Sequence, residues 1–255
     1  MKLKHCRGFT LVELLVTIAI TSIITGSLVS SLRAGNSSQI DQDNINELTE
    51  NLRTGMQMVT DALRNAKFAT PSSNLTSWFP SGGFSTSVIV PGTNTLNVAT
   101  CVLGTPLVKL NTNAASGATS ITLGTNQGLG IKQNNIVVLD YREPALVKSA
   151  DDTTPTITID TDPATTGNQG TTRAYPSATP LCVVRTTSFT ITSEGLVRTD
   201  SSSSATAVAE GITALSVASV SGTTNRYTVA LTGTTTMNNG STITRSLTAD
   251  TSVAN

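Results

Sequence analysis

The chain has 255 residues, which is long enough for one sizeable hydrophobic core or two small ones. Its 16 basic and 16 acidic side chains cancel, so it lacks the basic surplus that is typical of nucleic-acid-binding domains. Its one histidine, His5, stands near the N-terminus, which argues against a Ser-His-Asp triad and against His-ligated metals elsewhere. The 46 threonines and 28 serines favour exposed β-structure over an α/β enzyme with a ligand cleft.

A long apolar stretch occupies residues 9–32. About 20 such residues span a bilayer as a helix, whereas a cleaved secretory signal has an apolar core of about 7–15 residues. Lys2, Lys4 and Arg7 precede the stretch, and the positive-inside rule places such a basic segment in the cytoplasm. We therefore expect a transmembrane helix over residues 9–32, with residues 1–8 in the cytoplasm and the rest of the chain outside.

One acidic residue, Glu13, lies inside this apolar stretch. A carboxylate within a membrane helix costs about 2.5–3.5 kcal/mol on insertion scales, so it usually has a partner. The alternative is an uncleaved anchor in which the acid is incidental.

The residues around Glu13 carry a resemblance. The segment RGFTLVELL, residues 7–15, resembles the class III signal of type IV prepilins and type II secretion pseudopilins. The resemblance implies that a membrane aspartyl peptidase, the prepilin peptidase, cuts between Gly8 and Phe9 and then N-methylates Phe9. Glu13 becomes the fifth residue of the mature chain. Its expected role is to face the Phe9 ammonium of a neighbouring subunit in the filament core and so set the axial register between subunits.

The same resemblance implies partners and a location. The partners would be the prepilin peptidase and other minor pilins with the major pilin, or pseudopilins. The protein would cross the inner membrane once, with a periplasmic C-terminal domain, before it enters a pilus or pseudopilus filament. Loss of residues 1–8 leaves 13 basic and 16 acidic side chains, so we expect no nucleic acid partner. We also expect no cofactor, no metal and no enzymatic activity.

Residues 33–70 predict an amphipathic continuation of the first helix. Apolar residues recur there at spacings of three and four, which marks one face of a helix: Ile45, Leu48, Leu52, Met56, Val59, Leu63 and Ala66. The predicted helix runs from Phe9 to about Ala69, stops before Pro71 and is loosened near Gly26. We expect this apolar face to dock on the chain's own sheet rather than to form a coiled coil. Many major type IV pilins have a proline in this helix, so its absence favours a minor pilin or pseudopilin.

Residues 71–255 predict a β-rich head. Short Val/Ile/Thr runs alternate with turn residues and no helical period recurs, so the sheet should be antiparallel. The predicted strands are 88–90, 96–101, 119–123, 136–141, 156–160, 181–191, 196–198, 212–220, 227–231 and 243–249. Residues 104–178 look like a loop-rich insertion with few strong apolar positions. The expected fold is α+β and type IV pilin-like: a long N-terminal helix packed on an antiparallel sheet, with a β-rich insertion.

The C-terminal part of the head carries a second resemblance. The segment FTITSEGLVR at residues 189–198, followed by AEGITALSV at residues 209–217, is similar to the C-terminal half of PilW-type minor pilins and of J-type pseudopilins. The similarity covers roughly residues 182–255.

Two cysteines remain after removal of the leader, which contains Cys6. Cys101 and Cys182 form an even pair in an oxidising compartment. We expect a disulfide at the base of the insertion, the alternative being two buried free thiols. Asp160 and Asp162 are interpreted as solvated turn acids, with a Ca²⁺ site as the alternative.

These features lead to three functional hypotheses. The first is a minor pilin that helps to initiate or cap a type IV pilus through helix packing with other pilins. The second is a minor pseudopilin in the filament tip of a type II secretion system. The third is a pilus-tip adhesin or DNA-uptake subunit in which residues 104–178 are the binding module.

Overall fold

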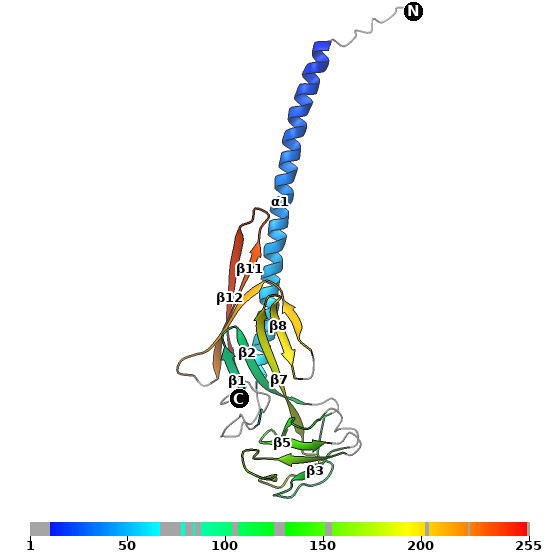
Figure 1. The fold of residues 1–255 in the computed structure, drawn as a ribbon, viewed down its shortest axis with the longest axis vertical. Coiled ribbons are helices and arrows are strands. Elements are labelled where there is room, and N and C mark those ends of the chain that lie inside the picture. Colours follow the sequence, from blue (N-terminus) through cyan, green and yellow to red (C-terminus); the bar gives the residue numbers. More distant parts are fainter. Residues whose placement is uncertain are drawn as a thin grey trace, which may run out of the picture. The chain divides into compact units, whose positions relative to one another are not determined.

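The structure is a computed structural model that describes residues 11–66, 78–79, 84, 88–103, 107–124, 131–150, 155–201, 204–223 and 225–253. The chain forms two compact units. The first contains Met1–Glu47 and Thr235–Ile243, and the second contains Leu48–Thr234 and Thr244–Asn255. An α+β fold results, with one long N-terminal helix followed by a mostly antiparallel β-structure (Figure 1).

A single helix, α1 (Leu11–Arg64), accounts for 54 residues. It is continuous through Gly26, so the expectation of a loosened segment there was wrong. One glycine costs a helix only about 1 kcal/mol, which a helix of this length tolerates. The helix also ends at Arg64 rather than near Ala69, and Ala66 is already outside it. Burial of Ala66 on the sheet, at 2% exposure, shows that the apolar face extends beyond the helical turns.

The second unit contains a nine-stranded antiparallel sheet with the order β1-β2-β7-β4-β5-β6-β3. β8 pairs with β7 and with β9. The strands are β1 (Ile89–Gly92), β2 (Thr95–Leu103), β3 (Ser120–Thr122), β4 (Ile136–Leu139), β5 (Glu143–Ala150), β6 (Thr156–Asp160), β7 (Leu181–Thr192), β8 (Gly195–Asp200) and β9 (Thr206–Ala209). The long strand β7 pairs with β4 through its first residues and with β8 through its last, which joins the insertion to the rest of the head.

A second sheet has three antiparallel strands in the order β10-β11-β12. Its strands are β10 (Ile212–Ser219), β11 (Arg226–Thr236) and β12 (Thr242–Ser252). The predicted strands 212–220, 227–231 and 243–249 correspond to these three. β5 and β9 were not predicted.

The C-terminal part of α1 packs on the sheets of the second unit. Leu52, Val59 and Leu63 are at most 3% exposed and belong to one core with side chains of β2, β7, β8, β10 and β11. A Cβ at Gly55 would lie 3.1 Å from Leu196 and 3.2 Å from Leu231, so the helix approaches the strands closely there. The prediction that the apolar face of residues 45–66 docks on the chain's own sheet is confirmed from Leu48 onward.

The insertion has a hydrophobic core of its own, contrary to our expectation. Its short strands each supply a few alternating apolar residues, all nearly inaccessible to solvent: Ile121, Leu123, Val137, Leu139, Ala145, Val147, Ile157 and Ile159. Each run is too short to stand out in the sequence, but together they form a continuous cluster. A second cluster contains Trp78, Phe79 and Phe84, which pack as core residues.

Asp160 is a buried structural acid, not the solvated turn residue we expected. Only 1% of it is exposed. Its Oδ1 accepts the backbone N–H groups of Asp162 (3.1 Å) and Gln169 (3.0 Å), and its Oδ2 lies 3.6 Å from Nζ of Lys148. These partners compensate the loss of water around the carboxylate, so the residue organises the loop that follows β6.

Glu143 is a second buried acid in the insertion. Its Oε1 accepts the N–H of Thr172 at 2.6 Å and its Oε2 accepts the hydroxyl of Tyr175 at 2.5 Å. Burial and the adjacent Glu143 carboxylate raise the pKa of Tyr175, so the hydroxyl keeps its proton and donates. The network joins the start of β5 to the segment that precedes β7.

Gly195, the first residue of β8, should tolerate an added methyl group poorly. Its φ is +102° and an added Cβ would collide with the carbonyl oxygen of Ala209. We expect Gly195→Ala to lower the free energy of unfolding by about 2–4 kcal/mol, through backbone strain and overpacking. Gly222→Ala is the matched control, because Gly222 has φ +78° but no atom within 4 Å of the added Cβ. Denaturant unfolding measures both, and equal effects would contradict the close approach.

Candidate assembly interface

The N-terminal part of α1 exposes an unusual number of large apolar side chains. Between 41% and 75% of each is exposed: Leu11, Val12, Leu14, Leu15, Val16, Ile18, Ile20, Ile23, Ile24, Leu28, Val29 and Leu32. Burying one such side chain is worth about 1.5–3 kcal/mol, so their sum exceeds the usual stability of a domain, about 5–15 kcal/mol. By length and composition this helix is able to cross a membrane. It therefore requires lipid or other helices around it.

Four hydroxyl side chains within the apolar segment are satisfied inside the helix. Each donates to a backbone carbonyl three or four residues earlier: Thr17 to Leu14 (2.9 Å), Thr21 to Thr17 (2.7 Å), Ser22 to Ile18 (2.7 Å) and Ser27 to Ile24 (2.8 Å). No polar hydrogen of these groups then needs water, which suits them to lipid or to a bundle of helices. Ser22, Thr25 and Gly26 are small residues in the lining of a shallow groove on this segment, which Ile18 and Val29 also line, and small residues let neighbouring helices approach closely.

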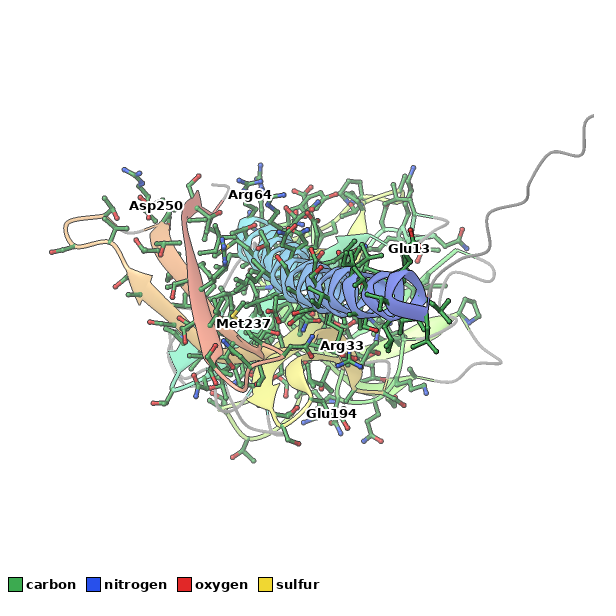
Figure 2. All side chains as sticks on the ribbon, turned by 90° about the horizontal axis from the view of Figure 1, so that it is seen from above. Glu13, Arg33, Arg64, Glu194, Met237 and Asp250 are labelled. Atoms are coloured by element: carbon green, nitrogen blue, oxygen red, sulfur yellow. A yellow bond between two sulfur atoms is a disulfide. The ribbon has the colours of Figure 1, made fainter. Side chains whose placement is uncertain are left out.

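Glu13 lies in the first turn of α1 (Figure 2). An acid there is favoured by the positive end of the helix dipole. The predicted cleavage and methylation residues, Gly8 and Phe9, lie outside the described residues, which begin at Leu11. Among the predicted assembly residues, the structure therefore describes Glu13 alone.

The hairpin between β11 and β12 contacts α1 just after the apolar segment. The N–H of Asn238 donates to Oδ1 of Asp41 (2.7 Å), and Nδ2 of Asn44 donates to the carbonyl of Thr236 (3.4 Å). All four residues belong to the first unit. Sequence reasoning missed this contact, because nothing local marks a partner almost 200 residues away.

Cys101 and Cys182 form a disulfide. It joins β2 to β7, with the two Cα atoms 5.6 Å apart and a sequence separation of 81. The two strands are direct neighbours, and the insertion leaves from the end of β2 and returns at the start of β7. The bridge therefore closes the base of the insertion.

Removing this bridge should destabilise the head without changing its fold. We expect the double variant Cys101→Ala/Cys182→Ala to lose about 2–4 kcal/mol of unfolding free energy, since closing a loop of this length restricts the unfolded chain. Denaturant unfolding with and without reductant is the measurement. The reductant should shift the unfolding curve of the wild type to that of the variant and should not change the curve of the variant. A wild-type unfolding curve that does not change with reductant would show that the bridge adds no stability.

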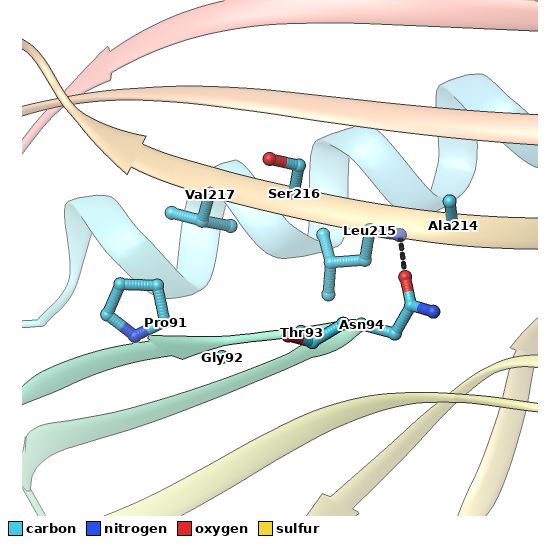
Figure 3. A pocket seen from close by; sticks show the side chains of 8 residues that line it. All are labelled: Pro91, Gly92, Thr93, Asn94, Ala214, Leu215, Ser216 and Val217. Atoms are coloured by element: carbon cyan, nitrogen blue, oxygen red, sulfur yellow. Dashed lines mark hydrogen bonds between the residues drawn. The ribbon is translucent and has the colours of Figure 1, made fainter.

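A pocket lies between the β1–β2 turn and β10 (Figure 3). It is lined by residues 91–94 and 214–217, and Oδ1 of Asn94 accepts the N–H of Leu215 at 3.1 Å. None of the lining side chains titrates, so the pocket offers no acid–base pair. Within the described ranges, no three His, Cys, Asp or Glu residues gather as metal ligands.

Residues 3–29 match the family model of the Prokaryotic N-terminal methylation motif. No curated protein and no solved structure matches the chain significantly. The motif is a type IV prepilin-like signal and supports a type IV pilin or pseudopilin. It implies processing by a prepilin peptidase and assembly with other pilins. With the apolar helix it suggests membrane anchoring and a pilus filament, and a structural protein rather than an enzyme.

Proposed function

We propose that this protein is a minor pilin that helps to initiate or cap a type IV pilus by packing its N-terminal helix against those of other pilins. The observation that carries the proposal is the apolar part of α1. Its large side chains are uncovered by the rest of the described chain, and all of it except its last three residues lies within the residues that match the methylation motif. A membrane span alone explains the exposure, but it does not explain the motif or the acid within it.

The proposed processing begins at the inner face of the membrane. The basic leader, residues 1–8, stays in the cytoplasm, so the bond between Gly8 and Phe9 lies at the membrane surface, where the prepilin peptidase cuts it. Cleavage frees an ammonium at Phe9, which the peptidase then methylates. The head, residues 71–255, lies in the periplasm, with residues 104–178 as its insertion, and residues 33–70 connect it to the transmembrane part.

Transfer from membrane to filament needs a driving force other than apolar burial. Lipid tails are as apolar as leucine, so moving α1 from lipid into a bundle gains little from the hydrophobic effect. Close packing and the attraction between Glu13 and a neighbouring Phe9 ammonium are the terms that favour the filament. A buried pair of opposite charges attracts strongly in low dielectric, and an unpaired charge there is costly. The pair would therefore select one axial register.

Two features favour a minor subunit over the bulk pilin. The helix from Leu11 to Arg64 contains no proline, unlike many major pilins, and residues 182–255 resemble PilW-type minor pilins. The same residues also resemble J-type pseudopilins, so a type II secretion filament is the second candidate.

The proposal is tested by isolating surface filaments from cells that produce the full chain. A minor pilin should appear in the sheared filament fraction in small amounts, and its deletion should greatly reduce the number of filaments. The subunits that co-purify distinguish a pilus from a secretion pseudopilus. Filaments of normal number that lack the protein would contradict the proposal.

A further inference from the structure

The outer edge of β12 is open in the structure. β12 is eleven residues long and ends the order β10-β11-β12 (Figure 1). The ladder with β11 uses odd-numbered positions: Met237 N–H donates to Ser241 O and Val253 N–H donates to Asn225 O. Hydrogen bonding alternates along an antiparallel pair, so the even-numbered residues of β12 point their N–H and C=O groups away from β11. In the described part of the chain no backbone group bonds to this edge.

The two faces of β12 differ in character. The odd-numbered face contains Leu247 and Ala249, which pack on the core of the second unit. The even-numbered face is exposed and almost entirely hydroxyl-bearing: Thr242, Thr244, Ser246, Thr248, Asp250 and Ser252. β12 is thus an amphipathic strand that contains neither proline nor glycine and has two charged side chains.

The other sheet edges are short or blocked. β1, β3 and β9 have three or four residues each, and β1 contains Pro91, which has no N–H to offer. On β10, the N–H of Leu215 is occupied by Asn94 (Figure 3). Proteins usually protect sheet edges in these ways because a long bare edge pairs with other chains. β12 is the exception among the described edges.

The start of β12 belongs to the same unit as the apolar part of α1. Asp41 and Asn44 hold the β11–β12 turn against the helix, about nine residues or 14 Å beyond Leu32. A subunit that packs against α1 is therefore brought close to the beginning of β12. The first residues of this edge, Thr242 and Ile243, thus lie in the unit that carries the proposed assembly interface.

We infer that the outer edge of β12 receives a β-strand from the head of a neighbouring pilin-like subunit standing in the same orientation. The inference rests on the proposed function. Two copies of this chain could also pair their β12 strands antiparallel about a two-fold axis. In that arrangement the β11–β12 turns of the two copies would lie about 36 Å apart, at opposite ends of the paired strands. This does not fit, because each β11–β12 turn is fixed to its own α1 near the membrane end, so the two turns must lie at the same height above the membrane. A same-orientation neighbour makes a heterologous contact, the kind that builds open filaments.

The test removes one backbone donor from the edge of the full-length chain. Thr248→Pro deletes an N–H that β11 does not use, and edge strands tolerate proline at such positions. Thr248→Ala is the matched control, because it removes the same side chain but keeps the N–H. We expect Thr248→Pro to lower incorporation into filaments at least tenfold with its melting temperature nearly unchanged, and Thr248→Ala to stay within twofold of wild type.

One further variant, Thr248→Lys, separates the possible failures. If Thr248→Pro melts much earlier than wild type, Thr248→Lys replaces it, since a lysine on the edge also opposes pairing and is expected to reduce incorporation similarly. The inference is overturned if a folded Thr248→Pro or Thr248→Lys protein enters filaments as well as wild type does. It is also overturned if Thr248→Ala loses as much incorporation as Thr248→Pro. Both outcomes leave the proposed function intact. Absence of the wild-type protein from filaments would instead overturn the proposed function.

Discussion

Replacing Glu13 with alanine is expected to lower incorporation into filaments by about a hundredfold while cleavage after Gly8 stays largely intact. In the proposed processing, the peptidase would act at the membrane surface on Gly8 and Phe9, whereas Glu13 would act later, in the bundle of helices. Removing one partner of a buried ion pair costs about 3–5 kcal/mol because the other charge stays buried and unpaired. In this case the unpaired group would be the Phe9 ammonium of the neighbouring subunit.

The ratio of mature chain in the filament fraction to mature chain in the membrane measures this effect. Glu50→Ala is a suitable control, since Glu50 is on the same helix but its side chain is 69% exposed and pairs, among the residues that the structure describes, with the exposed Arg53. It should incorporate normally, because exposed pairs contribute little. If Glu13→Ala incorporated as well as Glu50→Ala, the pairing role of Glu13 would have to be abandoned.

A bulky residue at position 8 is expected to block processing almost completely. In Gly8→Leu the side chain would occupy the site where the peptidase accepts glycine, so the leader would remain and the protein would accumulate in the membrane as the precursor. Gly8→Ala should be processed more slowly but detectably. The size of the chain in membrane fractions, compared with that of mature wild type, is the measurement.

Gly26→Ala controls for a general effect of losing a glycine in the N-terminal segment. No atom lies within 4 Å of the position that its Cβ would take, and alanine is a better helix former than glycine. This variant should be processed normally. Normal processing of Gly8→Leu would contradict the assigned cleavage site.

The helical half of the fold could be predicted because its signals are local. The apolar stretch and the three-four spacing from Ile45 onward predict α1 to within a few residues. β5 was missed because Glu143 and Pro144 follow the turn residues Asp140–Arg142 and look like a continuation of the loop. In the structure, Asp140 and Tyr141 both have positive φ and reverse the chain in a tight hairpin, a conformation unusual for tyrosine. Pro144 pairs with Val138 in β4, although a proline in a sequence argues against a strand because it has no N–H for the ladder.

The candidate site shows the same division between local and distant information. Gly8, Phe9 and Glu13 stand within six residues of each other, so a motif suffices to identify them. The contacts of Asp41 and Asn44 with the β11–β12 turn depend on how distant segments fold together. The same holds for Asp160, whose partners are the backbone of its own loop and Lys148; an acid next to turn residues looks solvated in sequence, and only packing buries it.

The most direct test of the account is the mass of the intact mature protein purified from cells, with the N-terminal peptide sequenced by mass spectrometry. We expect a chain that begins at Phe9 and carries one methyl group on its amine. A chain that begins at Met1, or at any residue other than Phe9, would contradict this expectation.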